Sequence, residues 1–145
     1  MKAVCLACLA LLWVVPAQAK KPAGGYTLTV PQRCARLPLL RDKQGNISFF
    51  HPKELRARAV RMVKPDYPPI EQNAQTQGSV LIGVVVGTTG AVQCAWLVEG
   101  HPFLGPQALQ AARKWKFQPM MTASGKISYG GLLKFNFSWT DGFQY

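Results

Sequence analysis

Residues 78–119 constrain the fold more than any other part of the chain, because two strand patterns and one helix pattern follow one another there with only short turns between them. Along residues 80–86, apolar β-branched side chains recur at every second position, which predicts a β-strand with a buried face. The sequence Gly87-Thr88-Thr89-Gly90 follows, and its two glycines favour a short hairpin turn. We therefore predict that a second strand returns along residues 91–98.

A basic amphipathic helix is predicted after this hairpin. Gly100-His101-Pro102 breaks the second strand, and Pro106 suits the first turn of a helix. The apolar side chains that follow recur at helical spacing and form one stripe: Ala108, Ala111, Ala112 and Trp115. The last turn gathers cations, which the negative end of the helix dipole favours: Arg113, Lys114 and Lys116. We expect the stripe, including Trp115, to lie in a hydrophobic core.

Residues 126–139 are predicted to form a final strand after a turn at Ser124-Gly125. One face of this strand is apolar and carries Leu133, Phe135, Phe137 and Trp139. The opposite face is polar and carries Lys134, Asn136 and Ser138. Such alternation is typical of an antiparallel sheet that is covered on one side.

The first 19 residues have the features of a secretory signal peptide. Lys2 provides a positive start, residues 3–15 form an apolar run, and Pro16-Ala17-Gln18-Ala19 ends in a small-x-small cleavage pattern. We expect cleavage after Ala19 and a periplasmic location. An uncleaved membrane anchor is the alternative, but the apolar run is shorter than the roughly 20 residues that span a bilayer as a helix.

The chain is strongly basic, with a formal net charge of +11. For an exported protein this charge favours anionic outer-membrane lipid, peptidoglycan or an acidic protein segment over nucleic acid. A basic surface that only keeps the protein soluble is the alternative reading.

Cys34 and Cys94 are the two cysteines that remain after removal of the signal peptide. An even pair in an oxidising compartment predicts a disulfide. The alternative is that Cys94 is a small buried hydrophobic residue and Cys34 a free thiol.

Residues 20–63 are predicted to form a partly irregular N-terminal extension. Within it a short strand can form at residues 26–30. Residues 53–63 form either a short basic helix or an extended segment. Three prolines within residues 65–69 then force an extended segment, and a further short helix can follow at residues 70–75.

Six motifs occur in the chain in a fixed order: Pro65-Asp66-Tyr67-Pro68, Gly78-Ser79-Val80, Gly90-Ala91-Val92, Gly100-His101-Pro102, Ala111-Ala112-Arg113-Lys114-Trp115-Lys116-Phe117-Gln118-Pro119 and Lys134-Phe135-Asn136-Phe137. In this order they resemble the TonB C-terminal domain family over residues 64–138, with residues 139–145 left as a C-terminal tail. The resemblance implies an α+β fold in which two helices pack on one face of a small three-stranded antiparallel sheet.

The resemblance also implies a function. Family members are periplasmic energy transducers that grip an extended segment of an outer-membrane transporter, while a proton-driven inner-membrane complex pulls on them. They bind by strand addition at the exposed edge of the last strand, which is physically sound because such an edge presents unpaired N–H and C=O groups. The corresponding residues here are Ile127, Ser128, Tyr129, Gly130, Gly131, Leu132, Leu133, Lys134, Phe135 and Asn136.

Further contacts are implied for the basic residues at the helix end, Arg113 and Lys116, which match positions that meet the transporter plug. Tyr67 and Pro68 are weaker candidates, since a packing role explains them better. We expect no membrane anchor and no proline-rich stalk in this chain. The resemblance therefore supports binding of a transporter segment more than transmission of force from the inner membrane. Force would have to come through another subunit, and a homodimer through the same edge is an open alternative.

The residues do not predict an enzyme, a cofactor or a metal site. His51 and His101 are the only histidines and carboxylates are few, so a metal would lack ligands. A cysteine nucleophile would need Cys34 beside His51 or Cys94 beside His101, and no other catalytic motif accompanies either pair. The second hypothesis is a structural envelope protein whose basic surface holds peptidoglycan or anionic lipid, without nucleic acid as a partner.

Overall fold

The computed structural model describes residues 28–41, 43, 45–140 and 142–144. The predicted signal peptide and the start of the strand expected at 26–30 lie outside this part of the chain, and residues 28–30 form no strand. None of the helices within the described residues is long and apolar enough to cross a bilayer.

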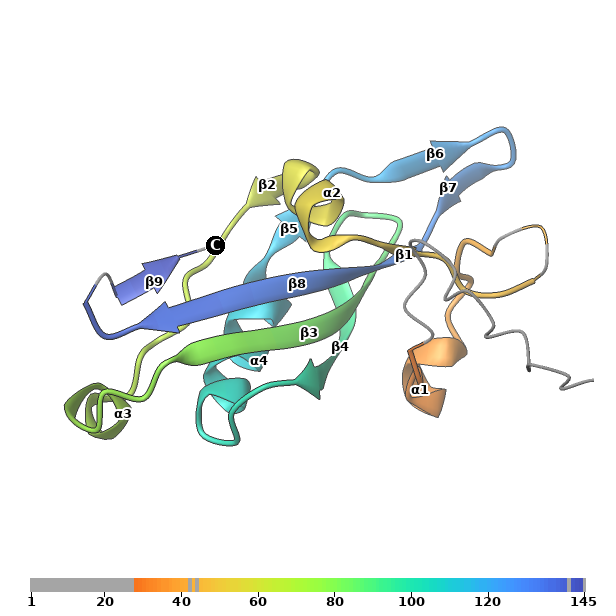
Figure 1. Ribbon diagram of the computed structural model, residues 1–145. Helices are drawn as coiled ribbons and strands as arrows, with labels where there is room; N and C mark the ends of the chain where they lie inside the picture. The colour runs from red at the N-terminus through yellow and green to blue at the C-terminus, as the bar shows by residue number, and fades with distance from the viewer. Residues whose placement is uncertain (1–27, 42, 44, 141, 145) are drawn as a thin grey trace, which may run out of the picture.

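Three antiparallel strands form the centre of the molecule (Figure 1). Strand β3 (Gly78–Val86) lies between β4 (Val92–Glu99) and β8 (Tyr129–Ser138), and it pairs with both. The predicted hairpin between β3 and β4 is confirmed. In its turn the Gly87 N–H donates to the Ala91 carbonyl at 2.8 Å, and Gly90 has a φ of 82°, which a glycine adopts without strain.

Two short strands extend this sheet beyond β8. β1 (Phe49–Phe50) runs parallel to β8, and β9 (Gly142–Gln144) runs antiparallel to it. The sheet therefore has five strands rather than the three expected. Strands of two and three residues are too short to show a period in the sequence, so only backbone pairing identifies them.

The final strand also differs from the prediction. Residues 126–139 are divided between two strands: β7 (Gly125–Ile127) turns back on β6 (Met120–Thr122), and β8 begins only after Ser128. Trp139 was expected in the core but is 51% exposed, because β8 ends at Ser138 and the chain turns there toward β9.

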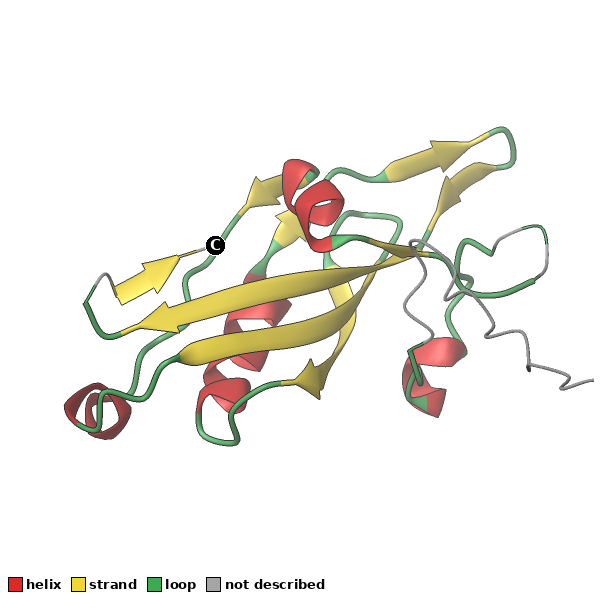
Figure 2. Ribbon diagram, in the orientation of Figure 1, coloured by secondary structure: helices red, strands yellow, loops and turns green. Residues whose placement is uncertain are grey.

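Within the described residues the strands are accompanied by four helices, α1 (Gln32–Ala35), α2 (Pro52–Ala57), α3 (Pro69–Asn73) and α4 (Leu104–Lys114). Figure 2 distinguishes them from the strands by colour. Of the two alternatives for residues 53–63, the helix is found up to Ala57 and the extended conformation from Ala59 to Arg61. There β2 (Ala59–Arg61) pairs with β5 (Lys116–Phe117), and the Arg58 carbonyl accepts the Gln118 N–H at 2.9 Å. Pairing with a distant strand thus overrides the local helical pattern.

The main core lies between the sheet and two helices, on what we call the helix face. The β3 side chains Val80, Ile82, Val84 and Val86 are fully buried there, as predicted. Leu55 of α2 and the apolar stripe of α4 cover them, and Trp115 is also buried. The second helix within residues 64–138, α3, adds no buried residue to this core, so α4 is paired with a helix of the N-terminal extension instead.

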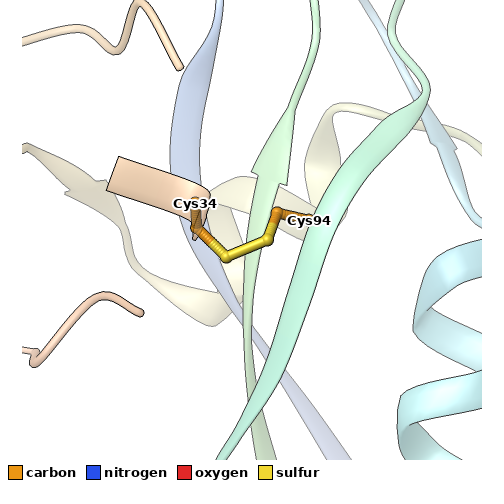
Figure 3. Close-up of a disulfide and its surroundings, with 2 residues drawn as sticks. All are labelled: Cys34 and Cys94. Carbon is orange, nitrogen blue, oxygen red and sulfur yellow. A yellow bond between two sulfur atoms is a disulfide. The ribbon is translucent and has the colours of Figure 1, made fainter. Parts of the chain in front are cut away.

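The opposite face of the sheet is covered by the extension, and we call it the extension face. Val85 and Trp96 pack there against Leu39 and Cys34, all of them buried. The predicted disulfide is confirmed: Cys34 in α1 is bonded to Cys94 in β4, with their Cα atoms 5.6 Å apart (Figure 3). Residues 28–50 therefore belong to the same folded unit as the sheet.

Candidate functional site

The candidate site is the edge of β8 that faces away from β3. Strand β1 covers it at Gly130 and Gly131, and β9 covers it from Asn136 to Ser138. Further back, the Leu40 N–H donates to the Ser128 carbonyl at 2.9 Å. Within the described chain no strand lies beside this edge between Gly131 and Asn136. We call residues 132–134 the open segment.

The backbone of the open segment directs some of its polar groups away from the sheet. In an antiparallel strand, successive residues direct their N–H and C=O groups to opposite sides. The Ser128 carbonyl points away from β3 toward Leu40. The backbone N–H and C=O groups of every second residue after Ser128, including Lys134, therefore point away from β3 as well. By the same alternation Leu133, which is in register with Ile82, directs its polar groups to β3.

Local packing explains why β1 sits where it does. The two phenylalanines of β1 point to opposite faces: Phe49 meets Trp96 on the extension face with ring centroids 6.0 Å apart, and Phe50 meets Tyr129 on the helix face at 5.5 Å. Glycines on β8 leave room for these rings and for α2. A Cβ on Gly130 would lie 2.7 Å from the Phe49 ring.

A hollow of about 190 Å³ lies beside the open segment, on the helix face between α2 and β8. Its walls carry cations and apolar groups together: Pro52, Lys53, Arg56, Trp115, Leu133, Lys134 and Asn136. Trp115 is fixed in this wall because its indole N–H donates to the Val63 carbonyl at 2.8 Å. Lys53 and Arg56 are exposed, so their charges face solvent at the mouth. Lys134 is exposed too, but its side chain points to the extension face because side chains alternate along β8.

Tyr129 anchors the start of β8 next to this edge. It is fully buried, and its hydroxyl donates to the Gln118 carbonyl at 2.7 Å. Burial raises the pKa of Tyr129 above its ordinary value of 10.0, and the nearby positive charge of Arg58 opposes the shift. The Arg58 guanidinium also lies over the Phe50 ring, 4.9 Å from its centroid, and so links α2 to β1.

The residues predicted for the site do not all lie together. Ser128 to Asn136 follow the edge, but Ile127 belongs to β7 and pairs with Met120 instead. Arg113 and Lys116 are exposed and do not line the hollow. Tyr67 packs edge-on against Phe137 with centroids 5.6 Å apart, and its hydroxyl donates to the Thr76 carbonyl, so the packing role is the one observed. Pro68 is half-buried beside it.

Sequence reasoning missed the contribution of α2 to this site. The residues Lys53 and Arg56 were visible as part of a basic helical pattern, but nothing in that pattern says which strand the helix covers. The contact of Leu55 with Gly131 places α2 over β8, and this contact joins residues far apart in the sequence. Among the described residues no group of three or more His, Cys, Asp or Glu side chains could hold a metal ion.

The fold defines a small α+β domain built on an antiparallel sheet with one partly open edge. The family model for the C-terminal domain of Gram-negative bacterial TonB proteins matches residues 63–139. The chain therefore belongs to the TonB C-terminal family, which is associated with the periplasm and with transporter interaction in energy-coupled transport.

A solved structure with a similar chain is the solution NMR structure of the TonB C-terminal domain from Pseudomonas aeruginosa. It shares 23% sequence identity with this protein, the match covers 71% of this chain and 94% of that one, and the TM-score is 0.47. No curated protein sequence matches the chain. Strand β1 and helix α2 both precede the residues that match the family model.

Proposed function

We propose that this protein binds an extended segment of an outer-membrane transporter, or of another envelope protein, by strand addition at the open segment of β8. The observation that carries the proposal is the gap between β1 and β9 on an otherwise paired edge. The chain's own strands occupy this edge in both directions, β1 parallel and β9 antiparallel. The edge is thus compatible with a partner strand of either orientation.

The gap sets the length of segment that binds without displacement. Five steps separate Gly131 from Asn136, and at about 3.3 Å per residue they span roughly 17 Å. A segment of about four residues would fit there. A longer partner would have to displace β9, which among the described strands pairs with β8 alone.

A second contact with the same partner is proposed for Arg113 and Lys116. Both are exposed cations at the C-terminal end of α4 and the start of β5. They would meet the folded part of a transporter while the open segment holds its extended part. In this proposal, energy coupling to a proton-driven inner-membrane complex is supplied by another subunit.

The test uses peptides from the periplasm-facing N-terminal segments of outer-membrane transporters, titrated into the folded protein in a calorimeter. At least one peptide should bind, and methylation of its backbone nitrogens should abolish binding because strand addition needs those donors. Absence of binding by every peptide at low salt would refute the proposal. Binding that is indifferent to N-methylation and falls steeply with salt would instead indicate adhesion of a basic surface.

A matched pair of protein variants tests the same point from the other side. Lys134→Pro removes an outward backbone donor, whereas Lys134→Ala removes only the side chain. We expect Lys134→Pro to lose peptide binding and Lys134→Ala to retain most of it. Far-ultraviolet circular dichroism of both variants checks that the sheet is intact. Equal binding by the two variants would contradict strand addition at this residue.

A further inference from the structure

We infer that the hollow between α2 and β8 receives a carboxylate side chain of the docked segment, so that the partner is an acidic extended peptide with its acid at one defined position. This inference rests on the proposed function, because the hollow lies beside the open segment and is reached by a strand added there. It goes further by assigning a side-chain pocket and the chemistry that fits it.

The geometry of a sheet determines which side chain would enter. Leu133 belongs to the helix face and lines the hollow. A strand added to β8 would lie about 4.8 Å away and would direct every second side chain to that same face. The partner residue opposite Leu133 would therefore point into the hollow, while its two sequence neighbours would point to the extension face.

The charge of the hollow selects an anion. Lys53 and Arg56 of α2 contribute two positive charges, whereas the side chain of Lys134, next to Leu133 on β8, points to the extension face. No carboxylate among the described residues forms an ion pair with Lys53 or Arg56. The one acidic residue of α2, Glu54, is turned toward the helix start, where its carboxylate accepts the His51 N–H at 3.2 Å.

The apolar part of the wall favours a side chain with an aliphatic stem. Trp115 is 2% exposed and Leu133 is equally buried, so both form the floor of the hollow below the cations. A glutamate could pack its methylene groups on this floor and place its carboxylate among the Lys and Arg groups at the mouth. The apolar floor would also strengthen the attraction, because charges near low-dielectric groups are less screened than in water.

The hollow would distinguish this protein within its family. Both of its cationic side chains come from α2, which lies before residues 63–139 that match the family model. Recognition of backbone by β8 would then accept many extended segments, and α2 would select among them by charge.

The experiment uses a designed peptide of alternating threonine and valine in which a single glutamate is moved through successive positions. Affinity for the full chain, measured by calorimetry, should rise by about fivefold when the glutamate lies opposite Leu133. It should change little at the two adjacent positions. Replacing that glutamate by the isosteric glutamine should remove the gain.

Two charge variants complete the design. The double variant Lys53→Gln with Arg56→Gln should abolish the preference for glutamate over glutamine. The control, Arg36→Gln with Lys126→Gln, removes two exposed cations that do not line the hollow and should keep the preference.

Three outcomes would overturn the inference, and they are distinguishable. Equal affinity for glutamate and glutamine peptides at every position refutes the pocket and leaves strand addition intact. A glutamate preference that both double variants reduce alike indicates only the overall charge of the protein. Failure of every peptide to bind refutes the proposed function and the pocket together.

Discussion

At the scale of single residues, Gly90 shows how tightly the hairpin turn is fitted to the rest of the chain. Its φ of 82° lies in the left-handed region, and its carbonyl accepts the Phe117 N–H at 2.8 Å. A Cβ at this position would collide with the Phe117 backbone carbonyl. The turn glycine was predicted from the sequence, but this close approach to the segment after α4 was not, because it depends on tertiary packing.

Gly90→Ala should therefore lower the free energy of unfolding by about 3 kcal/mol, since it combines backbone strain with a steric clash. Gly125→Ala is the control. Gly125 also has a positive φ, 110°, but nothing within 4 Å of its Cβ position, so we expect a loss of only about 1 kcal/mol. Urea denaturation measures both, and equal losses would show that the contact with Phe117 is unimportant.

Tyr129 makes the stability of the fold depend on pH at high pH. Its pKa is raised in the folded protein above the ordinary 10.0, so the folded state keeps the proton more tightly than the unfolded state does. This contribution is fully present below pH 10 and is lost as pH rises through the folded pKa. Denaturation at a series of pH values should show this loss in the native protein and a smaller one in Tyr129→Phe.

Below pH 10, Tyr129→Phe should be less stable than the native protein by about 1 kcal/mol, because the hydrogen bond to the Gln118 carbonyl is lost. Parallel pH profiles for the two proteins would contradict the assignment of the high-pH loss to Tyr129.

At the scale of helices and strands, the sequence predicted the elements that carry their own period. The β3–β4 hairpin and α4 were predicted because each is long enough for alternation or a helical stripe to appear. β1 and β9 could not be predicted, since two or three residues show no period and their pairing is decided by packing against β8. For the same reason the predicted number of strands was wrong, and the sequence did not indicate that β1 and β9 cover part of the edge of β8.

The disulfide is the element-scale link between the extension and the sheet. It joins Cys34 and Cys94 across 60 residues, and closing a loop of that length stabilises a fold by about 4 kcal/mol in the chain-entropy model. The double variant Cys34→Ser with Cys94→Ser should lose a comparable free energy of unfolding. The native protein treated with reductant provides a comparison without substitution, and a loss below about 1 kcal/mol in both would contradict this role.

Strand β9 is expected to compete with a partner for the edge of β8. A chain that ends at Trp139 would lack β9 and leave the edge uncovered from Leu132 to Ser138. Peptide affinity should then rise by a few-fold in calorimetry, with a small loss of thermal stability. Unchanged or weaker affinity would mean that β9 does not occlude the binding edge.

At the scale of the whole molecule, two layers meet at one sheet. The helix face is covered by α2 and α4, and the extension face by the segment that carries the disulfide. Both coverings reach the edge of β8, α2 from one side and β1 from the other, and β9 covers its far end. Among the described residues the open segment remains uncovered. The site therefore arises from the assembly of the extension with the family domain, which explains why no single stretch of sequence revealed it.

The most direct test of the account is hydrogen–deuterium exchange at the Lys134 amide, measured by NMR with and without a bound transporter peptide. The account predicts that this amide exchanges quickly in the free protein and slows by about tenfold or more on binding, because it gains a backbone acceptor. The Leu133 amide, which faces β3, should be protected in both states. Peptide binding that leaves exchange at Lys134 unchanged would contradict strand addition at the open segment.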